Sequence, residues 1–254
     1  MTNATQTQAS TLNLPLLKVI LEQLNSLGIS EAIIEPITDE EGNGVTRVRA
    51  GNKDHSIMIF DDIEDTLSDK ALAISSIKGL QTRIALFSNE KSSVTVTNRS
   101  NFAASIEIKE GKRKASYTLS HPNIILAPKV MPDYEILGNP IVLSEDFISA
   151  LLDVFASMGF TGKKEDRRIA IKSSGDEVTI TVFDGESDSF VETFQYAGGE
   201  VDIPSTQWEV EAFKLALRKA SETSLDKSVT FIVTDIGTAV MQSAPMSVIV
   251  APVH

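Results

Sequence analysis

The sequence contains no cysteine and few aromatic residues: one tryptophan, three tyrosines and eleven phenylalanines among 254 residues. Without cysteine the chain can form no disulfide, thiolate nucleophile, iron–sulfur cluster or cysteine-ligated zinc site. The longest apolar runs, such as Met246–Val253, fall short of the roughly 20 residues that a membrane-spanning helix needs. The opening stretch MTNATQTQAS lacks the basic and apolar regions of a signal peptide, and we expect residues 1–11 to form a flexible tail.

Basic residues are outnumbered by acidic ones. The chain has 23 lysines and arginines against 35 aspartates and glutamates, for a net charge of −12. Spread evenly, this charge would repel phosphate and argue against nucleic acid as a partner, but basic residues gathered on one face would reverse the argument. With 42% apolar and 23% charged residues, the composition is that of a globular protein. The length predicts one large domain or two of about 120–130 residues.

The motifs of common enzyme and cofactor sites are missing. No nucleophile elbow, P-loop or dinucleotide-binding glycine pattern occurs, and Gly42-Asn43-Gly44 reads as a turn between two strands. The acidic runs at residues 39–41, 61–65 and 184–188 do not follow a calcium-loop pattern, so we interpret them as solvated loops and strand edges. The histidines are far apart, with no metal-binding motif around them: His55, His121 and His254. We therefore expect no catalytic residue, no metal and no cofactor.

Two segments have the apolar spacing of amphipathic helices. Residues 16–27 carry apolar side chains at three- and four-residue spacing and stop at Gly28. Residues 147–158 repeat this pattern and stop at Gly159, at an offset of 131 residues, which is about half the chain. Start signals precede both runs: Asn13 and Pro15 for the first, Ser144 for the second.

A second pair of segments supports an internal repeat. Residues 71–87 and residues 208–220 each read as a short strand running into a helix, at an offset near 136. An insertion of about five residues reconciles the two offsets, and Gly162–Arg168 is a candidate for it. The sequence therefore predicts two copies of one unit, residues 12–122 and 141–254, joined by a proline-punctuated connector at residues 123–140.

Strands are predicted between these helices, because apolar and polar residues alternate there. Alternation with period two is typical of a sheet with one buried face and one solvent-exposed face. Two helices in each copy then have to cover the apolar face of a mostly antiparallel sheet, which predicts an α+β fold with two similar domains. The clearest alternating stretches begin at Val94, Ala104, Ala115, Val178, Val229 and Val248.

The basic residues fall into helix and loop groups. On the predicted helices they are Lys18, Lys78, Arg83, Lys214, Arg218 and Lys219; in the loops they are Lys109, Lys112, Arg113, Lys114, Lys163, Lys164, Arg167 and Arg168. One interpretation is that they form the solvated faces of amphipathic helices, as in any globular protein. The alternative is that the helices, on one side of the sheets, present these charges to a polyanion. The residues alone leave both interpretations open.

This organisation resembles the DNA sliding clamps, the polymerase processivity factors, and most nearly the bacteriophage and proliferating-cell-nuclear-antigen (PCNA) type with two domains per subunit. The resemblance rests on the twofold repeat, on Asp69–Leu80 as the second helix region of the first domain, on the connector and on the ending Val248–Pro252. It spans residues 12–254 and is a match of organisation more than of sequence. It implies a non-catalytic clamp that encircles duplex DNA and tethers the replicative polymerase for processive synthesis.

The resemblance implies a ring-forming homotrimer in the cytoplasm, in an infected bacterial host if the protein is viral, with helices lining a central hole. The expected DNA-lining residues are Lys18, Lys78, Arg83, Lys214, Arg218 and Lys219, which would contact phosphates without reading base sequence. The helix at residues 144–158 departs from this pattern, because it carries three acidic residues and no basic one. Either its face is neutral or the basic residues at 163–168 compensate.

The resemblance also implies that the polymerase and the clamp loader bind through short peptide tails, in an apolar pocket beside the connector and the C-terminal strand. A tail held in this way makes rebinding intramolecular, so that a weak contact can give processivity. The matching positions are Val48, Ile125, Leu126, Val130, Val250, Ala251 and Pro252. The alternative is that these residues are ordinary inter-domain core.

Ring closure is expected to use edge strands, residues 112–120 of one subunit against residues 187–196 of the next. The first strand is basic and the second acidic, which is the complementarity that such a contact needs. The interface candidates are Lys112, Arg113, Lys114, Asp188 and Glu192.

Two other functions stay open on the sequence alone. One is a non-catalytic, β-rich viral structural or assembly protein whose repeat reflects duplicated sandwich domains. The other is an enzyme that uses loop carboxylates, for which Asp61, Asp62 and Asp184 are the candidates.

Overall fold

A computed structural model describes residues 12–99, 102–129, 134–161, 163–185, 188–195, 203, 206–242 and 246–253. The expected tail at residues 1–11, the pocket candidate Val130 and the side chain of Asp188 lie outside the described part. The chain divides into two compact units. Unit 1 comprises Met1–Lys53 and Ile59–Val130, and unit 2 comprises Asp54–Met58 and Met131–His254.

Helix α1 (Leu14–Ser26) begins and ends at the residues that carry the sequence signals. The Asn13 side chain accepts the backbone N–H of Leu16 at 3.1 Å, which caps the first turn. Gly28 has a φ of 71°, and the N–H groups of Gly28 and Ile29 return to carbonyls of the last turn. This pair of bonds is the Schellman ending, which needs a left-handed residue where glycine is favoured.

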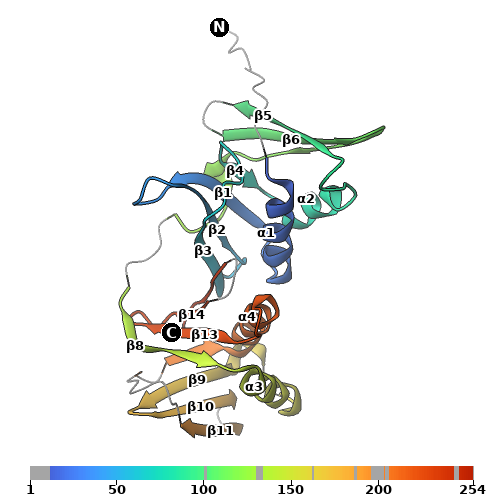
Figure 1. Cartoon of the computed structure of the whole chain (residues 1–254). Helices are drawn as coiled ribbons and strands as arrows, with labels where there is room; N and C mark the ends of the chain where they lie inside the picture. Colours follow the sequence, from blue (N-terminus) through green and yellow to red (C-terminus); the bar gives the residue numbers. More distant parts are fainter. Residues whose placement is uncertain are drawn as a thin grey trace. The chain divides into compact units, whose positions relative to one another are not determined.

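The strands of unit 1 form two groups, and α1 and α2 lie together beside them (Figure 1). The sheet orders are β4-β1-β2-β3 and β5-β6-β7, and β1 pairs antiparallel with β2 and β4, as β6 does with β5 and β7. After α1 the elements are β1 (Glu31–Thr38), β2 (Gly44–Gly51), β3 (Ile57–Ile63), β4 (Leu72–Ile74), α2 (Ile77–Ile84), β5 (Ser93–Arg99), β6 (Phe102–Glu110), β7 (Arg113–Thr118) and a 3-10 turn at Pro122–Ile124. The first two residues of β3 belong to unit 2.

Unit 2 repeats this order after one additional strand. Its strands are ordered β11-β10-β9-β12 and β15-β14-β13-β8, and Ile57 and Met58 pair with β15. The elements are β8 (Ile136–Leu143), α3 (Glu145–Ser157), a 3-10 turn at Lys164–Asp166, β9 (Arg167–Ser174), β10 (Glu177–Asp184), β11 (Asp188–Gln195), β12 (Thr206–Glu209), α4 (Val210–Thr223), β13 (Val229–Thr234), β14 (Ala239–Gln242) and β15 (Val248–Val250).

The predicted repeat is confirmed by topology. From α1 to β7 and from α3 to β15, the two units run through helix, four strands, helix and three strands in the same order. The sheet order β4-β1-β2-β3 corresponds to β12-β9-β10-β11, and β5-β6-β7 corresponds to β13-β14-β15. In each unit the two helices contact each other (Figure 1). The α+β prediction, with mostly antiparallel sheets and two helices in each domain, is therefore confirmed.

The turn and cap predictions also hold. Gly42 and Asn43 lie in the turn between β1 and β2, Gly44 begins β2, and the Asp39 carboxylate holds the turn by accepting the N–H groups of Glu41 and Asn43. Helix α3 begins at the predicted cap, since Ser144 Oγ accepts the N–H of Phe147 at 3.3 Å. No helix in the described residues is long and apolar enough to cross a membrane.

An aromatic cluster fixes α4 to the sheets of unit 2. Trp208, Phe213 and Phe231 are almost completely buried, with ring centroids 5.8 to 6.0 Å apart. Trp208 lies on β12, Phe213 on α4 and Phe231 on β13. Each ring therefore contributes large apolar burial at the point where the helix crosses both sheets.

Candidate nucleic-acid interface and peptide pocket

Lys18 is the basic residue of α1, and its ammonium group forms hydrogen bonds within unit 1. The Nζ atom donates to the Phe87 carbonyl and to Asn89 Oδ1, both at 2.7 Å. These bonds tie α1 to the segment that follows α2. Because its ammonium group already donates two hydrogen bonds within the chain, Lys18 is less available to bind a phosphate than its position on the helix predicted.

Helix α2 has a net positive charge, because Lys78 and Arg83 are accompanied by no acidic residue. Lys78 is exposed, and within the described residues no ion pair or hydrogen bond of its side chain is found. Arg83 is exposed too, but its guanidinium donates to the Gly79 carbonyl at 2.7 Å and lies 5.5 Å from the Tyr117 ring centroid. The two cations of α2 are therefore solvent-facing, with Arg83 partly oriented by its own helix.

Helix α4 carries the other three candidates. Arg218 is exposed and Lys214 is half-buried. Lys219 pairs with Glu222 at 2.5 Å on the same helix, so its charge is largely balanced locally. With Glu211 also on the helix, α4 has a net charge of +1.

Helix α3 remains the exception that the sequence indicated. Its acidic residues Glu145, Asp146 and Asp153 are all exposed. Lys227, from the loop after α4, donates to Glu145, and this bond raises the pKa of Lys227. The lysine neutralises one charge and leaves two acidic side chains on the helix surface.

The basic group at residues 163–168 does not lie on α3. Arg167 faces the buried Asp184 carboxylate at 3.6 Å and covers the Phe160 ring at 4.9 Å. Lys164 lies 3.8 Å from Glu209. These contacts stabilise the segment between α3 and β9, so the compensation considered for α3 has little support from Arg167 or Lys164.

In unit 1 the pocket candidates divide between core and surface. Val48 is fully buried in β2, and Ile125 packs against Ile33 and Ala73. Leu126 points outward with 65% of its surface exposed. The backbone on either side is anchored, since Glu31 accepts the N–H of Leu126 at 3.1 Å and Arg49 donates to the Pro128 carbonyl at 2.8 Å. Leu126 is therefore the unit 1 candidate that a partner could touch.

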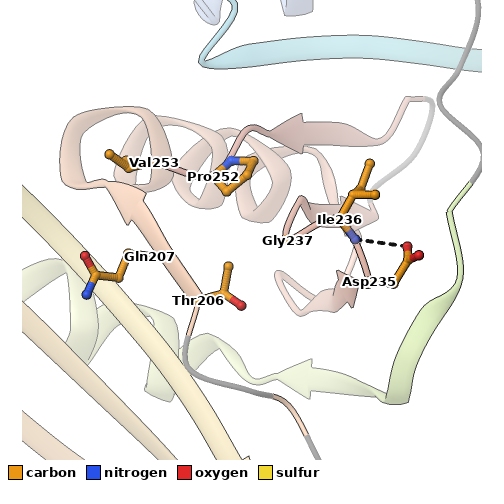
Figure 2. Close-up of a pocket in the computed structure, with 7 residues that line it drawn as sticks. All are labelled: Thr206, Gln207, Asp235, Ile236, Gly237, Pro252 and Val253. Carbon is orange, nitrogen blue, oxygen red and sulfur yellow. Dashed lines mark hydrogen bonds between the residues drawn. The ribbon is translucent and has the colours of Figure 1, made fainter.

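In unit 2 the structure contains a hollow of about 380 Å³ (Figure 2). Of the predicted residues, Pro252 lines it, whereas Val250 is fully buried in β15 and Ala251 is half-buried. The other lining residues were not predicted: Thr206, Gln207, Asp235, Ile236, Gly237 and Val253. The hollow thus combines apolar side chains with a carboxylate, an amide and a hydroxyl group.

Three segments that are distant in sequence build this hollow. The C-terminal tail is fixed to β12 because Val253 N–H donates to the Gln207 carbonyl at 2.9 Å. Trp208 holds the turn between β13 and β14, because its Nε1–H donates to the Gly237 carbonyl at 3.0 Å. Gly237 has a φ of 79°, and a Cβ there would lie 3.2 Å from Thr206 and 3.3 Å from Pro252. Glycine is therefore needed both for the turn and for the space.

The two candidate interface strands both end a sheet. Strand β7 is last in the order β5-β6-β7, and β11 is first in β11-β10-β9-β12. Arg113 on β7 and Glu192 on β11 are exposed. Lys114 differs, because it pairs with Glu107 on the neighbouring strand, and hydrogen bonds from Lys109 and Lys114 hold the pKa of Glu107 below its usual value. Lys112 is exposed in the turn before β7.

The carboxylates considered for an enzyme have structural partners. Asp62 forms a two-bond pair with Arg47, at 2.7 Å for each bond. Asp184 is buried and accepts the N–H of Thr161 at 2.6 Å. Among the described residues, no group of three or more histidines and acidic residues is arranged to hold a metal ion.

Comparison with known proteins identifies the architecture. No protein-family model and no curated protein sequence matches the chain. Solved structures do match. A chain of the complex between A. fulgidus PCNA and the C-terminal region of FEN-1 is similar with a TM-score of 0.63 and 18% identity, over 97% of this chain and 98% of that one.

Bacterial clamps match as well. The DNA polymerase III subunit beta of Pseudomonas aeruginosa gives a TM-score of 0.67 at 13% identity, over 100% of this chain and 69% of that one. The Helicobacter pylori beta clamp bound to a DNA ligase peptide gives 0.60 at 12% identity, over 100% and 68%. The two repeated units, their helix pairs and these matches lead to one conclusion: the chain has the fold of the DNA sliding clamps.

Proposed function

We propose that this protein is a DNA sliding clamp, a homotrimeric ring that encircles duplex DNA and tethers a replicative polymerase. The observation that carries the proposal is the match of the whole chain to a chain of the PCNA complex, with 97% of one and 98% of the other covered. A similarity confined to one unit would indicate a shared domain, but it would not indicate that the two domains form the same kind of subunit. The whole-length match supports the same two-domain subunit.

The charge on the helices supports a loose hold on DNA. A ring that encloses its ligand needs no tight contact, and strong binding would hinder sliding. Among the six candidate cations, no hydrogen bond, ion pair or ring contact within the described residues is found for the side chains of Lys78, Lys214 and Arg218, so these three are the strongest candidates to face phosphates. Lys18, Arg83 and Lys219 have partners within the chain and would contribute less.

The repeat supports ring closure through β7 and β11. By topology β15 corresponds to β7 and β3 corresponds to β11. Within unit 2, β15 takes Ile57 and Met58 as its outer antiparallel partners. Strands β7 and β11 have no such partner among the described residues, so their free edges in two copies can form the same kind of pair. Arg113 and Glu192 then supply opposite charges.

The hollow in unit 2 is the proposed site for partner peptides. A. fulgidus PCNA binds the C-terminal region of FEN-1, and the H. pylori beta clamp binds a DNA ligase peptide. By analogy, this chain would bind short tails of its polymerase and clamp loader. Ile236, Pro252 and Val253 offer the apolar wall that such a tail needs, and the exposed Leu126 of the connector is a further candidate contact.

A non-catalytic role agrees with the contacts of the acidic residues. Asp62 pairs with Arg47, and the buried Asp184 faces Arg167, so both carboxylates have partners within the fold. The sliding-clamp fold also favours this proposal over a viral assembly protein built from duplicated sandwich domains.

Two measurements test the proposal together. Light scattering should find a particle of three times 27.5 kDa, and electron micrographs should contain rings with a central hole. The purified protein should also stay on nicked circular duplex when its clamp loader and ATP are supplied, and should leave when the circle is linearised. A monomer at micromolar concentration that is never retained on circular DNA would refute the clamp function.

A further inference from the structure

Asp235 lies at the wall of the hollow and also contacts Glu135, the connector residue immediately before β8. Its carboxylate Oδ1 accepts the N–H of Glu135 at 2.9 Å and the N–H of Ile236 at 3.0 Å. In return, the N–H of Asp235 donates to the Glu135 carbonyl at 2.9 Å. Asp235 and Glu135 are therefore joined by two hydrogen bonds that run in opposite directions, although 100 residues separate them.

The remainder of this turn is held by bonds among its own residues, and the pairing of β13 with β8 ends next to it, where Thr234 lies opposite Ile136. Thr234 N–H donates to the Thr238 carbonyl at 3.0 Å, and the two threonine hydroxyls lie 2.6 Å apart. Gly237 N–H returns to the Thr234 carbonyl at 2.8 Å. The base of the turn is thus closed by its own residues, and Figure 2 shows the bond between the Asp235 carboxylate and the Ile236 N–H at its tip. Both the backbone and the side chain of Asp235 bond to Glu135.

We infer that Asp235 is a positioning residue that fastens Glu135, the connector residue immediately before β8, to the peptide pocket. The inference rests on the proposed function, since it assigns the hollow to partner peptides. The carboxylate orients Ile236, which lines the hollow, and with the same oxygen sets the backbone of Glu135. A peptide that binds in the hollow then contacts Ile236 and Glu135 in positions that are already fixed. This preorganisation lowers the conformational entropy that is lost on binding.

A different role for the same carboxylate has to be separated from this one. Among the described residues that line the hollow there is no lysine or arginine, so Asp235 could instead act as a direct charge partner for a basic peptide. A positioning role needs an acceptor oxygen and tolerates loss of the charge, whereas a charge-partner role needs the charge itself. Asp235→Asn keeps the acceptor and removes the charge, and Asp235→Ala removes both.

Amide hydrogen exchange on the intact, full-length protein tests the positioning role without any ligand. Asp235→Ala should speed exchange in residues 134–137 between about fivefold and thirtyfold, the range expected for one or two lost hydrogen bonds. Asp235→Asn should stay close to wild type. Glu135→Ala should also stay close, because the contact uses the backbone of Glu135.

Asp39→Ala is a matched control. Asp39 likewise holds a turn by accepting two backbone N–H groups, in unit 1. Its loss should speed exchange around residues 39–43 and leave residues 134–137 unchanged. If Asp235→Ala leaves exchange in residues 134–137 unchanged in a folded protein, or if Asp39→Ala raises it equally, the inference fails.

Peptide affinity provides a second test. A random phage-displayed library is selected for binding to the wild-type protein, and a selected peptide is synthesised and used as the probe. Asp235→Ala should weaken this peptide at least about fivefold, and Asp235→Asn should restore most of the affinity. Equal weakening by both variants would assign Asp235 to direct charge contact and overturn the positioning role. If no library peptide binds the hollow, the peptide-binding part of the proposed function fails, and the exchange data still decide whether Asp235 holds the connector.

Discussion

Replacing the helix cations should separate DNA contact from helix packing. The change is the triple variant Lys78→Met, Lys214→Met and Arg218→Met, with Lys18→Met as its matched control. Each lysine or arginine that neutralises a phosphate contributes about 0.9 to the slope of log affinity against log salt concentration. If all three side chains of a subunit contact duplex at once, the triple variant should lose about 2.7 from that slope.

Lys18→Met should behave differently because its ammonium group is engaged inside the protein. Its loss breaks two bonds of 2.7 Å, to the Phe87 carbonyl and to Asn89. Hydrogen bonds from a charged donor contribute up to about 1.5–3 kcal/mol each, and partial exposure reduces this, so we expect about 1–3 kcal/mol of lost stability in total. The salt slope should stay at the wild-type value.

Fluorescence anisotropy with a short linear duplex, repeated over a series of salt concentrations, measures the slope. Urea unfolding measures the stability of the same samples. A triple variant with an unchanged slope would refute the assignment of these helices to DNA. A slope that falls as much in Lys18→Met as in the triple variant would refute the claim that internal hydrogen bonds decide which cations reach the phosphates.

Three further predictions address the turn, the strand edges and acid stability. Gly237→Ala should cost about 1–3 kcal/mol in urea unfolding, because the residue has a φ of 79° and a Cβ would crowd Thr206 at 3.2 Å; wild-type stability would contradict this. Arg113→Glu and Glu192→Arg should each weaken the trimer by about 1 kcal/mol per interface, and the double swap should restore it by light scattering; no recovery would place the contact elsewhere. Hydrogen bonds from Ser228 and Ser224 lower the pKa of Asp226 to about 2 from 3.8. Its contribution to stability is therefore complete above about pH 4 and lost as the pH falls toward 2, so the difference in thermal midpoint between wild type and Asp226→Asn should shrink over that window; a constant difference would count against it.

Local signals predicted much of the fold. Helix ends are fixed by hydrogen bonds between residues at most five positions apart, so they can be predicted from the nearby sequence. The examples are Asn13, Gly28 and Ser144. The repeat was visible because apolar residues that face a sheet recur at fixed spacing in both copies. The turn at residues 42–44 followed from its glycines, whereas the bonds from the turn to the Asp39 carboxylate were not predicted.

The site was harder to predict because its contacts are non-local. Lys18 has the position of a solvent-facing cation, and its acceptors lie 69 and 71 residues away. The hollow joins residues near 206, 236 and 252, none of which forms a motif by itself. Val48 and Val250 were predicted at the pocket, and the structure buries both side chains completely, so they offer no surface to a partner. Sequence spacing indicates which face a residue occupies and not which distant group already binds it.

The charges of the helices have a consequence for motion. Counted by formal charge, α1 is neutral, α2 carries +2, α3 carries −3 and α4 carries +1, so the four helices sum to zero. In the proposed ring, a phosphate backbone passing along them would meet shallow attractive and repulsive regions in turn, with no deep well at any step. In the proposed ring such a lining would give low friction: the duplex would be retained by enclosure, and its diffusion would be limited more by solvent drag than by the making and breaking of ion pairs.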